Sequence, residues 1–127
     1  MKDLDWSNLS FGYRQTDYNV RCCYRNGKWG EIEVCSDEYL KLHMAATCLH
    51  YGQEAFEGLK AYRCPDGKVR VFRMDENAAR LQSTCRGIMR PEVDTEMYEE
   101  MGKREVRVNQ EWIATDESGA TLYSRQL

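Results

Sequence analysis

The chain has 127 residues, of which 42% are hydrophobic and 31% charged, a balance typical of one folded globular domain over residues 1–127. Its net charge of −3 argues against a nucleic-acid-binding surface. The first residues form no apolar signal-like run, and no segment approaches the ~18 apolar residues of a membrane helix. A cytoplasmic protein that binds neither nucleic acid nor membrane is therefore expected.

The 16 residues at the start are polar with scattered aromatics and are expected to form an extended arm. Residues 18–24 and 29–35 then alternate as two strands, and the Asn26-Gly27 pair between them favours a tight hairpin turn. Residues 44–49 are expected to form a short helix. A second hairpin, residues 57–64 and 68–73, is predicted around the turn at residues 65–67.

Two main helices follow in the second half of the chain. Asp75 is suited to cap a helix over residues 76–85, and Gly87 to end it. The apolar residues of this helix lie at helical spacing and are expected to pack on the sheet: Ala78, Leu81 and Cys85. The predicted fold class is α+β, a small antiparallel or mixed sheet of hairpins with two main helices.

The second main helix begins at a cap formed by Asp94 or Thr95 and extends to about residue 112. Its expected buried face carries Met97, Met101, Val108 and Trp112, but Glu105 falls on the same stripe. Gly102 lies in the middle of the helix, where glycine costs about 1 kcal/mol relative to alanine. A strand is expected to begin at residues 120–123.

Six cysteines are present, and none of them forms a CxxC pair. Without a secretory signal we expect free thiols, mostly behaving as small buried apolar groups. The spacing of His43, Cys48 and His50 matches no standard zinc finger, so no metal site is predicted.

Three segments carry a specific family resemblance. Residues 50–63 (HYGQEAFEGLKAYR), 72–81 (FRMDENAARL) and 121–125 (TLYSR) closely resemble the N-terminal signature of branched-chain amino-acid aminotransferases. These are pyridoxal-phosphate enzymes of fold type IV. The resemblance implies the small domain of such an enzyme, whose parent reaction transfers an amino group between leucine, isoleucine or valine and 2-oxoglutarate.

The resemblance also implies roles for individual residues. Arg80 matches the arginine that contacts the cofactor phosphate; on spacing alone it reads as a solvated residue on a helix face. Tyr51 and Phe56 match residues that line the branched side-chain pocket, the tyrosine being lent to the neighbouring subunit; on spacing alone such aromatics fill a core. Gly58 would let the backbone approach the ligand.

At the end of the chain, Tyr123 and Arg125 match the residues that help hold the substrate carboxylate, for which a guanidinium fork is suited. Gln126 stands where the family has proline, and in this chain we expect both residues to be a frayed terminus.

Transamination needs a lysine that binds the cofactor covalently and an acidic partner for the pyridine nitrogen. In the family both lie in a larger domain after the segment that resembles residues 121–125. No lysine of this sequence lies in a motif like the catalytic one, so no catalytic residue is assigned. We expect a domain that is inactive and binds no pyridoxal phosphate alone, and whose partners are the large domain and a second subunit.

Three hypotheses stay open at this stage. The first is a silent domain, meaning one that is catalytically inactive. The second is a half-enzyme, whose missing half is supplied in trans by another chain. The third is a binding module that self-associates through an exposed edge. The polar run at residues 102–105, where the family is more apolar, is consistent with a fragment altered for solubility.

Overall fold

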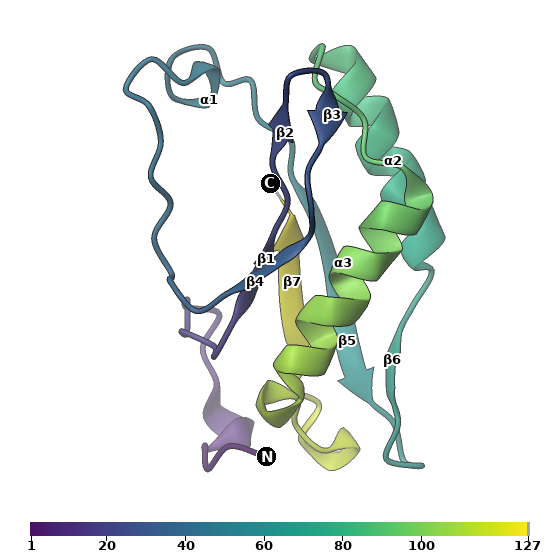
Figure 1. The fold of residues 1–127 in the computed structure, drawn as a ribbon. Helices are drawn as coiled ribbons and strands as arrows, with labels where there is room; N and C mark the ends of the chain where they lie inside the picture. The colour runs from purple at the N-terminus through teal and green to yellow at the C-terminus, as the bar shows by residue number, and fades with distance from the viewer. Residues whose placement is uncertain (127) are drawn as a thin grey trace.

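The computed structural model describes residues 1–126, except the side chain at position 116. Its helices and strands, in chain order (Figure 1), are η1 (Trp6–Asn8), β1 (Asn19–Arg21), β2 (Tyr24–Arg25), β3 (Lys28–Trp29), β4 (Glu33–Cys35), α1 (Thr47–His50), β5 (Glu57–Arg63), β6 (Val69–Val71), α2 (Met74–Gly87), α3 (Thr95–Val108), η2 (Gln110–Trp112), η3 (Asp116–Ser118) and β7 (Leu122–Gln126).

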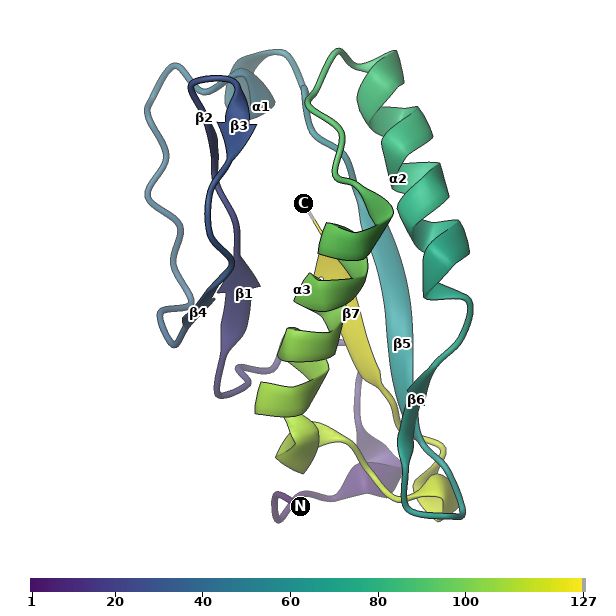
Figure 2. The ribbon, with the colours of Figure 1, turned by 45° about the vertical axis from the view of Figure 1, so that its right-hand side comes forward.

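The strands form three antiparallel sheets. The main sheet has the order β6-β5-β7, and the first hairpin is divided into the ladders β1-β4 and β2-β3. The predicted turn is confirmed, since Asn26 and Gly27 both have positive φ, 53° and 80°, as the tight hairpin turn requires. The expected α+β class with two main helices is likewise confirmed. Figure 2 shows α2 and α3 running along the main sheet, with the β1-β4 ladder on the far side of α3.

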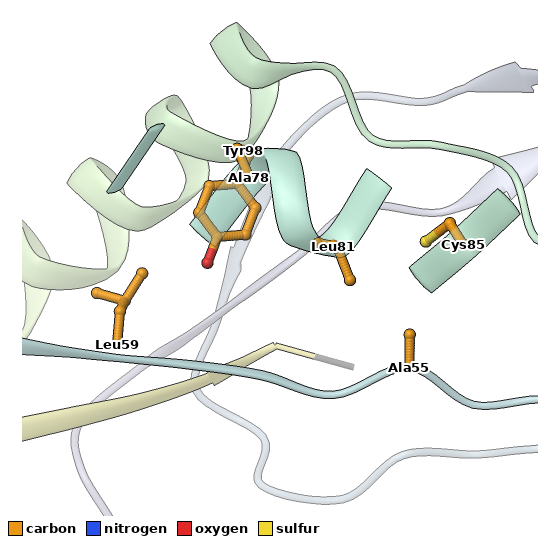
Figure 3. Close-up of a cluster of buried hydrophobic side chains, with 6 residues drawn as sticks. All are labelled: Ala55, Leu59, Ala78, Leu81, Cys85 and Tyr98. Atoms are coloured by element: carbon orange, nitrogen blue, oxygen red, sulfur yellow. The ribbon is translucent and has the colours of Figure 1, made fainter. Parts of the chain in front are cut away.

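The core lies between β5 and α2. Strand β5 buries alternate residues, and its Leu59 packs with Ala78, Leu81 and Cys85, the helical stripe expected from the sequence. Figure 3 shows how Tyr98 of α3 completes this cluster from the neighbouring helix.

The start of α2 differs from the prediction. Arg73, not Asp75, occupies the cap position, in the left-handed region with φ 48°. Asp75 lies in the first turn, where a carboxylate also favours the positive end of the helix dipole, and it pairs with the Arg73 side chain. Gly87 is the last residue of the helix, so it ends where expected.

Helix α3 starts as predicted, because the Asp94 carboxylate accepts a hydrogen bond from the backbone N–H of Met97 at 2.8 Å. The expected apolar face is displaced, however. The buried residues of the helix are Tyr98 and Gly102, and Asn109, directly after it, is also buried.

Gly102 has a packing reason in this position. A Cβ placed there would lie 3.1 Å from Cε and 3.2 Å from Sδ of Met74, so glycine allows α2 and α3 to approach closely. Lys103 and Arg104 pair with Glu99 and Glu100, one turn earlier, and Arg104 also donates from Nη1 to the carbonyl of Ile32 at 3.3 Å.

All six cysteines are free, but only Cys85 is buried. The expectation that most of them fill the core is therefore wrong, because Cys22, Cys35, Cys48 and Cys64 are only partly buried and Cys23 is exposed. Within residues 1–126, no three His, Cys, Asp or Glu side chains lie close enough to hold a metal ion. None of the described helices is long and apolar enough to span a bilayer.

Candidate functional site

The site residues gather where β5 begins and β7 ends. In the antiparallel register Gly58 lies opposite Arg125, and Lys60 lies opposite Tyr123. Paired residues share a face of the sheet, and Leu59, between Gly58 and Lys60, faces the helices. The four paired residues therefore lie on the face away from α2 and α3.

The expectation that the last residues fray is wrong for the described chain. Strand β7 pairs with β5 from Glu57↔Gln126 to Ala61↔Leu122, so Tyr123 and Arg125 sit in a hydrogen-bonded ladder. A strand held along its length fixes the direction of both side chains, which a frayed terminus would not do.

Gly58 is required by a close approach at this point. A Cβ at position 58 would lie 2.5 Å from Oη of Tyr123 and 3.1 Å from its Cζ. The Tyr123 phenol thus covers the backbone of β5, and any side chain at position 58 would displace it.

Two further groups surround the Tyr123 ring. The Arg125 guanidinium carbon lies 5.8 Å from the ring centroid, within range of a cation–π contact, and the Phe11 ring is 5.8 Å away at 48°. Phe11 comes from the N-terminal arm, which the sequence presents only as polar with scattered aromatics. The arm and β7 enclose a hollow of about 700 Å³ that Tyr123, Arg125, Lys60 and Phe11 help to line.

Arg80 lies at the same end of the β5-β7 ladder but on the helix side. Its Nε donates to Oε2 of Glu57 at 2.9 Å, and its Nη2 donates to Oε1 of the same carboxylate. Asn77 donates from Nδ2 to Oε1 of Glu57 at 2.8 Å and to the carbonyl of Gly58 at 3.0 Å. Asn77 thereby links Glu57, the partner of Arg80, to Gly58, which lies against the Tyr123 ring.

The burial of this cluster is uneven. Glu57 is 3% exposed, whereas the Arg80 side chain is 69% exposed. The hydrogen bond from Arg80 holds the pKa of the Glu57 carboxyl below its usual value, although burial opposes the shift. Glu57 is thus a buried anion whose charge is balanced by an exposed arginine.

Tyr51 and Phe56 do not join either group. Tyr51 is 84% exposed in the loop after α1, and Phe56, just before β5, is 56% exposed. The burial alternation along residues 55–59 turns Phe56 to the same side as Gly58.

A second carboxylate, which is partly buried, lies on α3. Glu105 accepts a hydrogen bond from the Ser124 hydroxyl of β7, and burial raises the pKa of the Glu105 carboxyl. Nearby, Asn109 bonds to both backbone groups of Tyr18. The sequence placed Glu105 on the expected apolar face of the helix, but it did not predict that Ser124 is its hydrogen-bond partner.

The sequence of this chain is similar to that of several known proteins. No family model matches the sequence. It is 48% identical over 125 residues to a branched-chain-amino-acid aminotransferase of Haemophilus influenzae and 43% identical over 125 residues to that of Helicobacter pylori. It is also 35% identical over 128 residues to the chloroplastic branched-chain-amino-acid aminotransferase 5 of Arabidopsis thaliana.

These alignments take in 98–100% of this chain but only 31–37% of each relative. The chain is therefore homologous to part of an aminotransferase. The part it matches belongs to proteins named branched-chain-amino-acid aminotransferases, and the chain spans about a third of their length.

Proposed function

We propose that the chain supplies one wall of the active site of a cytoplasmic branched-chain aminotransferase, which transfers an amino group between leucine, isoleucine or valine and 2-oxoglutarate. The observation that carries the proposal is the 48% identity to such an enzyme over 98% of the chain. The shared position of Gly58, Tyr123 and Arg125 on one face of the sheet supports it.

The substrate carboxylate would bind to Arg125 and Tyr123. The guanidinium offers a planar fork of donors that matches a carboxylate, and the Tyr123 hydroxyl adds a neutral donor beside it. Because Arg125 also stacks on the Tyr123 ring, at 5.8 Å, it is held above the sheet.

The branched side chain would contact Phe56 and, from a second subunit, Tyr51. An apolar wall selects by buried area, at about 0.8 kcal/mol per methylene. Both side chains are exposed in the isolated chain and so are available to such a ligand or subunit.

The cofactor phosphate would bind to Arg80. Two of its five N–H donors are held by Glu57, which leaves three on an exposed side chain, so the residue fits an anionic group. When bound, pyridoxal phosphate supplies the electron sink for amino-group transfer. The residues named here bind and orient; we assign none of them a proton-transfer role.

The chain acts, in this proposal, with a cofactor-bearing domain and a second subunit, and it is inactive alone. The test is to titrate the 127-residue chain with pyridoxal phosphate, reduce with borohydride and determine adducts by mass. We expect no adduct confined to a single lysine, and no leucine-to-2-oxoglutarate transamination. A stoichiometric adduct at one lysine would overturn the proposal that the chain is inactive alone.

Complementation separates a silent domain from a half-enzyme. The chain is mixed with the separately produced large domain of a homologous aminotransferase, and transamination is followed. Recovered turnover that is lost with Arg125→Ala would support assembly in trans. Turnover by the large domain alone, unchanged by the chain, would contradict the proposed contribution of this chain to the site.

Self-association is a second candidate, favoured by the apolar surface of residues 39–51. The large apolar side chains of this segment are exposed: Tyr39, Leu40, Leu42, Met44, Leu49 and Tyr51. Sedimentation at increasing protein concentration tests it. A dimer that dissociates on replacing Leu42 and Met44 by serine is expected, and a monomer at all concentrations would contradict it.

A further inference from the structure

The carboxylate of Glu57 is fully occupied. One oxygen accepts from Arg80 Nε at 2.9 Å, and the other accepts from Arg80 Nη2 and from Asn77 Nδ2, the latter at 2.8 Å. This two-point contact engages one edge of the planar guanidinium, and a fork held at two points cannot rotate about its axis.

The opposite edge of the guanidinium is open. Both N–H groups on Nη1 and one on Nη2 remain, and the Arg80 side chain is 69% exposed while Glu57 is 3% exposed. The buried partner therefore holds one edge of the guanidinium and leaves the unused donors on the exposed side of the residue.

We propose that Glu57 is a positioning residue that holds Arg80 in the orientation in which its free edge receives a phosphate group. The inference rests on the proposed function, in which Arg80 binds the cofactor phosphate. Asn77 extends the arrangement, because its Nδ2 also donates to the carbonyl of Gly58 at 3.0 Å. Asn77 thereby fixes the position of Glu57, and through it of Arg80, relative to Gly58 of β5.

Charge and positioning predict opposite effects for the same substitution. Glu57→Gln removes a negative charge beside a bound phosphate, so electrostatics alone predicts tighter binding. The amide, however, presents N–H groups to the donors of Arg80 or Asn77, so its single oxygen cannot reproduce the two-point contact with Nε and Nη2 of Arg80. Positioning therefore predicts weaker binding, by about three- to tenfold if the loss equals one hydrogen bond of ordinary net strength.

Because the chain alone is expected to bind no pyridoxal phosphate, the experiment uses its mixture with the separately produced large domain of a homologous aminotransferase. The arginine side-chain Nε–H signals of the isotope-labelled chain are followed by NMR in that mixture during titration with pyridoxamine 5′-phosphate. This probe has the phosphate but no aldehyde, so it forms no covalent lysine adduct. Pyridoxamine, which lacks the phosphate, is the comparison ligand. The variants are Glu57→Gln and Arg80→Lys, and Asp66→Asn is the control.

Asp66 is matched to Glu57 because it also binds an arginine at two points, with Arg70 Nη1 and Nη2 at 2.8 and 2.6 Å. It lies in the turn between β5 and β6, at the other end of β5 from Glu57. Its replacement should leave the dissociation constant of the phosphate probe unchanged.

Each outcome decides between the claims. Weaker binding of the phosphate probe by Glu57→Gln, with pyridoxamine unaffected, is the expected result. Equal or tighter binding by Glu57→Gln, while Arg80→Lys binds more weakly, overturns the positioning inference alone. No phosphate-dependent binding by the mixture that contains the unmodified chain, or none lost with Arg80→Lys, overturns the phosphate role of Arg80 in the proposed function, and the inference with it.

A ligand-free measurement guards against a variant that fails to fold. In the unmodified chain the Arg80 Nε–H should exchange with solvent more slowly than that of Arg125, whose guanidinium has a ring contact in place of a carboxylate. Equal exchange rates would show that Glu57 does not hold the guanidinium, and would overturn the inference without any substitution.

Discussion

The Asn109 side chain offers the sharpest test of how α3 holds the first hairpin. It is 1% exposed and makes three hydrogen bonds. Its Oδ1 accepts from the N–H of Tyr18 at 3.1 Å, and its Nδ2 donates to the carbonyls of Tyr18 and Glu105, both at 3.0 Å. Two of these bonds cross 91 positions of the sequence to reach the entry of β1.

Asn109→Ala removes all three bonds. At a net value of about 1 kcal/mol each the loss would approach 3 kcal/mol. Tyr18 is partly exposed, so water can replace its share, and the Glu105 carbonyl retains its place in the helix. We therefore expect a loss of about 2 kcal/mol in the free energy of unfolding, or about 6–10 °C in melting temperature for a domain of this size.

Urea denaturation followed by circular dichroism measures this loss, and amide hydrogen exchange locates it. Exchange should accelerate in β1 more than in β5. The matched control is Asn8→Ala, which removes one exposed bond to Asp5 and should change stability by less than about 0.5 kcal/mol. A loss below about 1 kcal/mol for Asn109→Ala, with β1 exchange unchanged, would refute the reasoning.

Three other substitutions test the packing and the site. Leu81→Ala, at a core position 5% exposed, should cost about 2–5 kcal/mol in the free energy of unfolding, measured by urea denaturation. Gly58→Ala should displace the Tyr123 ring and abolish its nuclear Overhauser contacts with Phe11, at an overpacking cost of about 1–3 kcal/mol; retained contacts would contradict the close approach. Burial raises the pKa of the Glu105 carboxyl above its usual 4.5, so the folded state binds a proton on Glu105 more tightly than the unfolded state does. The contribution of this proton to stability is full below pH 4.5 and is lost as the pH rises. Glu105→Gln should therefore unfold at higher urea concentration than the unmodified chain at pH 7 but not at pH 4, and an equal difference at both would exclude the shift.

Features set by neighbours in the sequence were predictable. The tight turn at Asn26, the helix cap at Asp94 and the apolar stripe of α2 each depend on residues a few positions apart, where backbone sterics and helical spacing decide. The same local reasoning misplaced the α2 cap, because the left-handed conformation of Arg73 has no side-chain signature.

The site could be predicted only in part. The resemblance supplied Arg80 and Arg125, but pairing between β5 and β7 and the contact of Phe11 with Tyr123 join distant segments that no short motif records. A signal for Glu57 was present: its alternation with Leu59 places it on the buried face, where a carboxylate needs a partner. Arg80 is that partner, 23 positions away.

The polar side of α3 explains why β7 presents its site residues outward. The Tyr98 hydroxyl donates to Gln126 at 3.1 Å, and the Ser124 hydroxyl donates to Glu105, so alternate residues of β7 are tied to the helix. Shifting the strand by one residue would exchange its two faces and bring Tyr123 against α3, leaving the partly buried Glu105 carboxylate unpaired. Directional hydrogen bonds oppose that shift more selectively than apolar contacts could, because many hydrophobic side chains would fit the same space. The carboxylate that looks misplaced on the helix thus helps to determine which face of β7 carries Tyr123 and Arg125.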